Sequence, residues 1–232
     1  METFIRISLI IHVLAGSLAL FAGLGAILLR NNVKSHRPFG KVYFWCMTVV
    51  FITAVYISSY KGNIFLFCVS FFTYYSCLTA FRSLKLKKLH VDQKPHWVDW
   101  GIEALFGITH FGFVCFGVLL LSGKDKSIMG GGMTEFGVIC LVFGLLGLNG
   151  NRQSIKRLRG NVEHSNYWLL AHIGGMLGSY IGAITAFMVN NNNRFIHLPQ
   201  IMAWLGPAVI LVPLIIYEVS RFKKKAVLLQ AK

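Results

Sequence analysis

The chain has little charge, and very little of it is negative. Only 13% of its 232 residues are charged, and 8 residues are Asp or Glu. A soluble domain of ordinary composition carries about 25% charged residues. Here the hydrophobic share is 55% and the mean hydropathy is +0.61. The composition therefore excludes an ordinary soluble domain and predicts a protein that has lipid as its solvent.

The signatures of common soluble chemistries are also missing. The sequence has no H-E-x-x-H, no G-x-S-x-G, no P-loop and no G-x-G-x-x-G that opens a helix after a strand. Its 5 cysteines form no C-x-x-C pair and lie within apolar runs, which is typical of small buried side chains. The net charge of +15 comes without an aromatic and basic platform, so no nucleic-acid binding is expected.

Seven apolar runs fill most of the chain. A hydrocarbon core takes about 20 apolar residues per helical crossing, so the length allows roughly seven crossings with short connections. The runs predict helices over 4–29, 42–60, 63–81, 101–121, 134–149, 167–189 and 200–219. We therefore expect an all-α transmembrane bundle that forms a single domain over residues 1–232.

The basic residues gather in alternate gaps between these runs. Most of them lie within 30–41, 82–94, 152–159 and 221–225, whereas the intervening gaps hold few. Cytoplasmic connections of membrane proteins carry an excess of Lys and Arg. The alternation predicts that the N-terminus lies outside and that the C-terminus lies in the cytoplasm.

Three glycines of the sixth run share one helix face. Gly174, Gly178 and Gly182 recur at i+4 spacing, and small residues let the backbones of two membrane helices approach closely. We therefore expect the sixth helix to be central and to pack through this face.

Three histidines, His12, His110 and His172, lie inside apolar runs. Ionisable residues within a membrane are costly and are therefore functional candidates. The helical rise of about 1.5 Å per residue places His12 toward the outer surface, His110 near the midplane and His172 toward the inner surface. A neutral imidazole binds haem iron or a transition metal, so this ladder predicts ligands for b-type haem or, less favoured, copper. The alternative is that each histidine only hydrogen-bonds a neighbouring helix.

Asp99, Glu103 and His110 follow one another at i, i+4 and i+11, so they share a stripe of the fourth helix. This stripe indicates a proton or cation path from the inner interface to the midplane. It supports an alternative function as a small proton-coupled transporter or channel. Acidic groups near a helix N-terminus also suit the macrodipole, so a purely structural role for Asp99 and Glu103 stays open.

Basic and polar residues form a rim at the predicted cytoplasmic side. His36 and Arg37 precede the second run, and Arg152 and His164 precede the sixth. Such a rim binds a haem propionate, an acidic headgroup or an acidic partner. Charge that only sets the topology is the alternative, and a membrane scaffold subunit that binds a partner through these residues is a third possible function.

The first helix and the start of the second carry a resemblance. His12 is followed by Ala15-Gly16-Ser17, and the second run is preceded and opened by His36-Arg37-Pro38-Phe39-Gly40-Lys41-Val42-Tyr43-Phe44-Trp45. This pattern resembles a bacterial family of predicted membrane proteins of unknown function over the first half of the chain. The resemblance implies a bacterial inner-membrane setting and a multi-helix bundle, but it implies no reaction.

The leading hypothesis is an inner-membrane oxidoreductase or electron-transfer protein. His12, His110 and His172 supply haem ligands in this hypothesis, and Arg37 and Arg152 hold propionates. A quinone-like donor in the lipid bilayer would exchange electrons with the site. The substrate and the oligomeric state are not determined by the sequence.

Overall fold

The chain folds into a bundle of helices. The computed structural model describes residues 2–122, 133–162 and 164–230, and these residues form no strand. The helices are α1 (Glu2–Leu28), α2 (Val33–Lys61), α3 (Ile64–Ser83), α4 (Trp97–Leu121), α5 (Met133–Leu158), α6 (Tyr167–Asn191) and α7 (Gln200–Gln230), with the short π-helix η1 (Asn192–Ile196) before α7. The predicted all-α bundle is confirmed.

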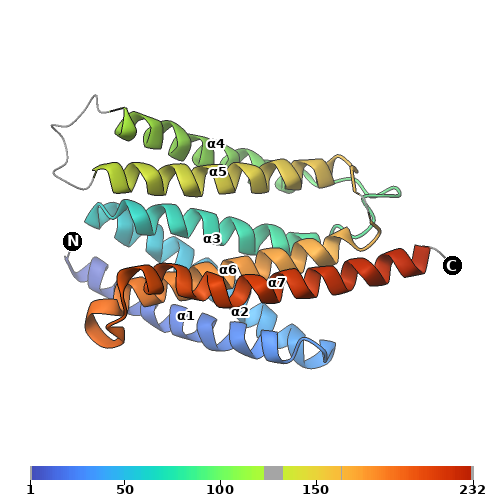
Figure 1. The fold of residues 1–232 in the computed structure, drawn as a ribbon, viewed down its shortest axis with the longest axis horizontal. Helices are drawn as coiled ribbons and strands as arrows, with labels where there is room; N and C mark the ends of the chain where they lie inside the picture. Colours follow the sequence, from blue (N-terminus) through green and yellow to red (C-terminus); the bar gives the residue numbers. More distant parts are fainter. Residues whose placement is uncertain (1, 123–132, 163, 231–232) are drawn as a thin grey trace.

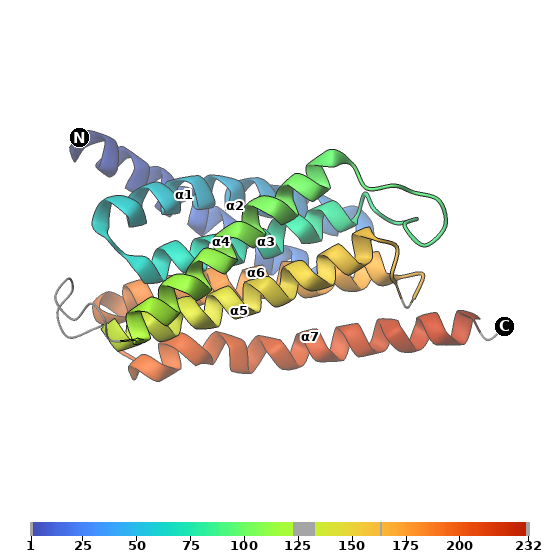
Figure 2. The ribbon, with the colours of Figure 1, turned by 90° about the horizontal axis from the view of Figure 1, so that it is seen from above.

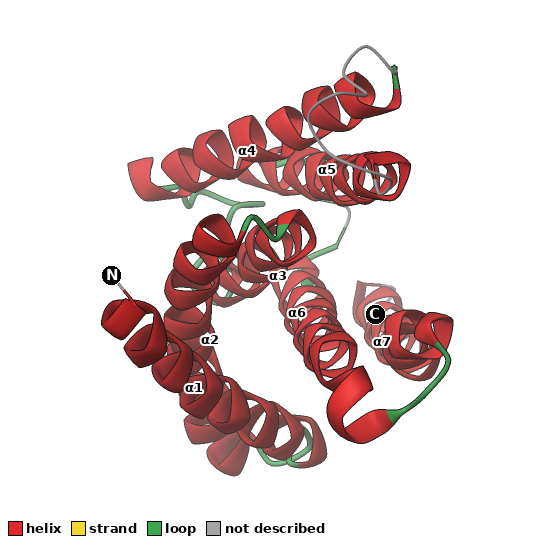
Figure 3. Cartoon of the chain, turned by 90° about the vertical axis from the view of Figure 1, so that its left-hand side faces the viewer, coloured by secondary structure: helices red, strands yellow, loops and turns green. Residues whose placement is uncertain are grey.

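α3 lies at the centre of the bundle. It packs against α2, α4, α5 and α6, whereas α6 packs against α3 and α7 and touches α1. Seen along its length, the bundle has the α4–α5 pair on one side of α3 and the α1–α2 hairpin on another (Figure 3). α7 runs along one edge (Figure 2). The sequence pointed to the sixth helix as central, but α3 contacts more of its neighbours.

Within the described residues, five helices are long and apolar enough to cross a membrane: α1, α2, α3, α4 and α6. The remaining two, α5 and α7, run alongside them (Figure 1). The helix count thus agrees with the sequence analysis, while crossings by α5 and α7 stay predictions.

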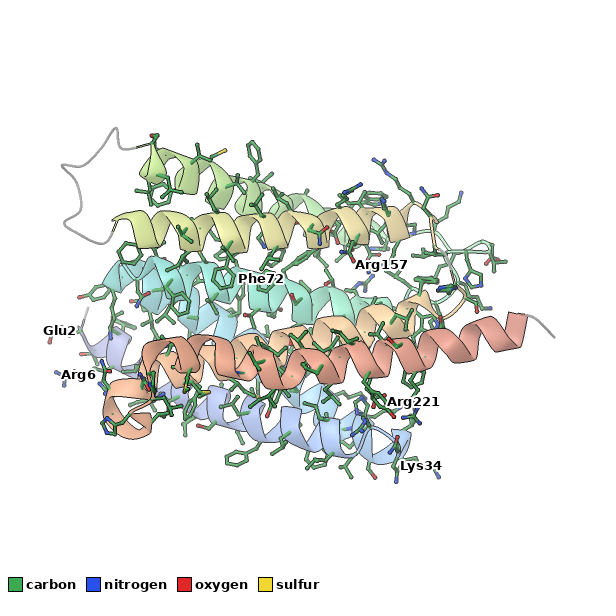
Figure 4. All side chains as sticks on the ribbon, viewed as in Figure 1. Glu2, Arg6, Lys34, Phe72, Arg157 and Arg221 are labelled. Atoms are coloured by element: carbon green, nitrogen blue, oxygen red, sulfur yellow. The ribbon has the colours of Figure 1, made fainter. Side chains whose placement is uncertain are left out.

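The basic connections meet at one end of the bundle. The α1–α2 turn, the α3–α4 and α5–α6 connections and the C-terminus all lie at the right of Figure 1, and the N-terminus lies at the left. Lys34, Arg157 and Arg221 mark this side in Figure 4, opposite Glu2 and Arg6. We call it the basic end. The side of the membrane that it faces stays a prediction.

Three helices begin or end well outside their predicted apolar runs, among them α7, which continues to Gln230 rather than ending at residue 219. α2 begins at Val33 rather than at residue 42, because the Asn32 side chain caps it by accepting hydrogen bonds from the backbone amides of residues 34 and 35. α5 continues to Leu158 rather than ending at residue 149. Hydropathy locates the apolar part of a helix but not its polar extension. His36, Arg37 and Arg152 therefore lie on helices and not in connections.

The contact face of α6 includes only one of the three predicted glycines, Gly182. A Cβ atom added to Gly174 or Gly178 would meet nothing within 4 Å. A Cβ on Gly175 would lie 2.7 Å from the Ala80 side chain, and one on Gly182 would overlap Thr73. α6 therefore approaches α3 through Gly175 and Gly182, because the i+4 spacing of glycines does not reveal which face meets a neighbour.

The cysteines follow the sequence prediction in part. Cys68, Cys77 and Cys140 are buried, as expected of small apolar side chains. Cys46 is partly buried and Cys115 is exposed. Exposure at Cys115 is compatible with its place on α4, since an apolar side chain on the rim of a membrane bundle meets lipid rather than water.

We expect Gly175→Ala to destabilise the α3–α6 contact. The added methyl group meets Ala80 and the Ser76 carbonyl oxygen at 2.7 and 2.8 Å, and such overpacking costs about 1–3 kcal/mol. Gly178→Ala is the matched control, because its methyl group meets no neighbour. Thermal unfolding in detergent measures both variants. Equal midpoints for the two would contradict this packing.

Candidate functional site

The inner face of α4 carries a column of polar residues. Asp99, Glu103 and His110 are buried on it, together with Phe106 and Phe113. These positions repeat every three or four residues, so they form one stripe that faces α3 and α5. The stripe predicted from the sequence is therefore a buried face of the helix.

Glu103 accepts hydrogen bonds from residues of two other helices, α3 and α5. Its Oε2 accepts hydrogen bonds from the Tyr75 hydroxyl of α3 and from Asn151 Nδ2 of α5, each at 2.8 Å. Its Oε1 accepts one from Ser154 Oγ of α5 at 2.5 Å. The residue is only 5% exposed. These three donors, all of them neutral groups, satisfy the buried carboxylate.

His110 lies at the other end of this column, farther from the basic end of the bundle. Its Nδ1 lies 2.8 Å from Asn151 Oδ1. Because Asn151 Nδ2 donates to Glu103, Oδ1 is the acceptor, and the proton of the neutral imidazole sits on Nδ1. Nε2 then carries the lone pair, and it is buried without a hydrogen-bond partner among the described residues.

Gly147 makes room for His110. A Cβ atom at this α5 position would overlap the imidazole ring, so a larger residue there and His110 exclude one another. The Tyr75 ring packs edge-on against the other side of the imidazole, with ring centres 5.2 Å apart. The pocket for His110 is thus built by α3 and α5 together.

Asp99 lies at the end of the column that is nearest the basic end of the bundle. Arg82 of α3 donates to both carboxylate oxygens, through Nε at 2.8 Å and Nη2 at 3.0 Å. Asp99 also accepts a hydrogen bond from the His96 backbone amide at the start of α4, where the two residues form a capping box. Asp99 thus has a structural role at the start of α4, which the sequence analysis left open, and it also forms an ion pair.

A small cavity separates Asp99 from Glu103. Its volume is about 30 Å³, and the polar side chains that line it belong to Thr79, Arg82, Ser83, Asp99, Glu103, Ser154, Arg157 and Tyr167. Arg157 lies at the basic end (Figure 4). Within the described part of the chain its guanidinium forms no hydrogen bond and no salt bridge. The cavity thus joins the buried column to the basic end of the bundle.

A second polar arrangement involves two histidines on other helices. His36 Nδ1 of α2 lies 2.9 Å from the Ala26 carbonyl oxygen, and His172 Nδ1 of α6 lies 3.1 Å from the Ala80 carbonyl oxygen. Because a carbonyl oxygen only accepts, both Nδ1 atoms carry a proton and both Nε2 atoms carry a lone pair. The two ring centres are 6.2 Å apart and the ring planes are nearly perpendicular.

The structure does not bring the three intramembrane histidines together. His12 Nδ1 is 2.9 Å from Thr53 Oγ1, which itself donates to the Val49 carbonyl oxygen, so His12 joins α1 to α2 by an ordinary hydrogen bond. His110 bonds to Asn151, and His172 lies beside His36. In the part of the chain that the structure describes, no group of three or more His, Cys, Asp or Glu side chains is placed to hold a metal ion.

The remaining rim residues lie apart from these two sites. Arg37 is exposed on α2, next in sequence to His36. Arg152 is exposed on α5, which packs against α4 and α3. His164 lies in the α5–α6 connection with its Nδ1 buried and without a partner among the described residues.

Sequence analysis missed several members of the two sites. Tyr75, Arg82 and Ser154 were not singled out, because a hydroxyl in an apolar run or an arginine in a basic gap is common. His36 was assigned to the rim and not to a pair with His172. Its position became informative only when α2 proved to begin at Val33.

The apolar helices with satisfied polar groups inside them define an integral membrane protein. Residues 9–107 match the model of a family described as "Predicted membrane protein (DUF2306)", a family of unknown function. The match runs from α1 into α4 and includes His12, His36, Asp99 and Glu103. It confirms the resemblance to a family of predicted membrane proteins. No curated protein and no solved structure matches the chain.

We expect Asn151→Ala to destabilise the protein strongly. The change removes the partner of His110 Nδ1 and one donor to Glu103, and each buried group left unpaired costs about 1–3 kcal/mol. Asn190→Ala is the control, since that side chain is exposed and bonds only to the Ala186 carbonyl oxygen within its own helix. Unfolding in detergent at increasing denaturant measures the difference. A loss no larger than in the control would contradict the network.

Proposed function

We propose that this chain is an integral membrane electron-transfer protein that binds b-type haem between His36 and His172. The supporting observation is the pairing of two imidazoles from α2 and α6 with both Nε2 lone pairs available. Neither Nε2 has a hydrogen-bond partner among the described residues. The other two intramembrane histidines, His12 and His110, are not ligands in this proposal, because neither packs against a second imidazole among the described residues.

The distance between the two rings would allow both imidazoles to hold one metal ion. An imidazole nitrogen binds a metal at about 2.0–2.1 Å, so two imidazoles on opposite sides of one metal ion have ring centres roughly 6 Å apart. The ring centres of His36 and His172 are separated by 6.2 Å. Metal-binding histidines commonly donate their other N–H to a backbone carbonyl, as both of these do.

The surroundings suit an acidic cofactor. The pair lies toward the basic end, and exposed Arg37 directly follows His36 in the sequence. A guanidinium group pairs with carboxylates such as haem propionates. A haem bound here would carry single electrons, with a quinone in the bilayer as the proposed donor.

An absorption spectrum of the detergent-purified full chain tests the proposal. We expect a Soret band that shifts on reduction with dithionite, with sharp α-bands. His36→Ala and His172→Ala should each lose the spectrum, whereas His12→Ala, whose imidazole only bonds Thr53, should keep it. Metal analysis of the same samples distinguishes haem iron from copper. A colourless, metal-free protein that also fails to take up added haemin would overturn the proposal.

We propose further that the membrane is a bacterial inner membrane and that the basic end faces the cytoplasm. A green fluorescent protein fused after Lys232 should fluoresce, because it folds in the cytoplasm. The same reporter fused after Ser122, at the opposite end of α4, should stay dark. Alkaline phosphatase fusions at the two sites should show the reverse pattern. Fluorescence after Ser122 alone would show that the orientation is inverted.

A further inference from the structure

The polar column on α4 is separate from the histidine pair, and electron transfer at that pair does not account for it. We propose that Glu103 is a proton-binding site that loads and unloads from the basic end only. The inference goes beyond the proposed electron transfer and does not rest on haem, since its residues come from α3, α4 and α5. A purified protein without haem would therefore not contradict the proposal for Glu103.

Glu103 lacks the cation that Asp99 has. Arg82 neutralises Asp99 through two hydrogen bonds, but among the described residues no salt bridge reaches the Glu103 carboxylate, and Arg157, which lines the same cavity, acts on it only through its charge. Burial away from water disfavours a charge without such a partner. The titratable and charged groups around Glu103 are Tyr75 and Arg82 of α3, Asp99 and His110 of α4, Arg157 of α5 and Tyr167 of α6.

The hydrogen bonds around Glu103 accommodate either protonation state. Ser154 Oγ lies 2.5 Å from Oε1, and a hydroxyl group donates to a carboxylate or accepts from a carboxylic acid. Oε2 keeps its two donors, Tyr75 and Asn151, in both states. A proton therefore binds at Oε1 without displacing any heavy atom. His110 acts as a positioning residue, because its Nδ1–H holds Asn151 Oδ1 and so directs the Asn151 amide toward Glu103.

A route for the proton exists on the side of the basic end. The cavity of about 30 Å³ between Asp99 and Glu103 has room for one water molecule and is lined by groups that hydrogen-bond to it. Arg82, Asp99 and Arg157 lie along this cavity, toward the end of the bundle where the basic connections meet. A single water therefore connects Glu103 with the polar end of the bundle.

The column is closed in the other direction. One turn beyond His110, Phe113 packs with Cys68 and Cys140 in a buried apolar cluster, around which lie Ile64, Phe67, Phe71, Ile139 and Phe143. The next cavity, of about 300 Å³, lies beyond this layer near the α2–α3 turn and is lined mainly by apolar side chains. No carboxylate or imidazole lines it among the described residues. The geometry points to a one-sided site and not to a channel through the membrane.

Infrared spectroscopy of the full chain tests the binding of the proton. We expect a protonated carboxyl C=O band that disappears as the pH is raised. The band should be absent from Glu103→Gln at every pH and present in Glu218→Gln, which removes a buried carboxylate paired with Arg30 and Arg221. A titrating band that is the same in wild type and Glu103→Gln would overturn the proposal, as would the lack of any such band in the wild type.

A second variant keeps the test decisive if Glu103→Gln does not fold. Ser154→Ala removes the hydrogen bond to Oε1, so the C=O band should move to higher frequency and its titration midpoint should change. A band that keeps its frequency and midpoint in Ser154→Ala does not come from Glu103 and would contradict the assignment.

Proteoliposomes containing a trapped pH dye test whether access is one-sided. With a potassium diffusion potential, proton entry should equal that of protein-free vesicles and should not change in Glu103→Gln. A potential-driven proton flux that is lost in Glu103→Gln would show a path through the membrane and would overturn one-sided access, whatever the infrared result.

Discussion

The hydrogen bonds that converge on Glu103 hold α3, α4 and α5 in one arrangement. Between membrane helices the hydrophobic effect provides no attraction, because lipid tails are as apolar as the side chains. Polar contacts and close backbone approach then select the packing. Tyr75, Asn151 and Ser154 are buried, and all three donate to the Glu103 carboxylate that they share.

The other half of the bundle uses the same principle with backbone acceptors. His36 donates to the Ala26 carbonyl oxygen of α1, and His172 donates to the Ala80 carbonyl oxygen of α3. Tyr180 of α6 donates to the Leu20 carbonyl oxygen, and Tyr43 bonds Ser179 at 2.7 Å. Ala26 and Ala80 lie in the last turns of their helices, where a carbonyl oxygen lacks an i+4 amide partner, so the imidazoles bond acceptors that the helix ends leave available. Four helices are joined in this way.

α3 is therefore shared by both polar sites. Its Ala80 backbone supports His172, while its Tyr75 side chain supports Glu103. The proposed electron-transfer site and the proposed proton site thus lie on different sides of one helix. Both sites lie toward the basic end of the bundle. Coupling between them can pass through α3 or through α6, because α6 carries both His172 and Tyr167, and Tyr167 lines the cavity beside Glu103.

The sequence by itself determined the class of the protein, the helices and the end at which the basic residues gather. Hydropathy and the positions of Lys and Arg report on the solvent around each segment, and they need no knowledge of neighbours. The i, i+4 and i+11 spacing also placed Asp99, Glu103 and His110 on one stripe, since helix geometry is local. The tertiary structure alone decided that His172 meets His36, that Glu103 meets Ser154 and that Gly175 rather than Gly178 meets α3. Those pairings depend on how each helix is rotated toward its neighbours, and rotation is set by contacts between residues far apart in the chain.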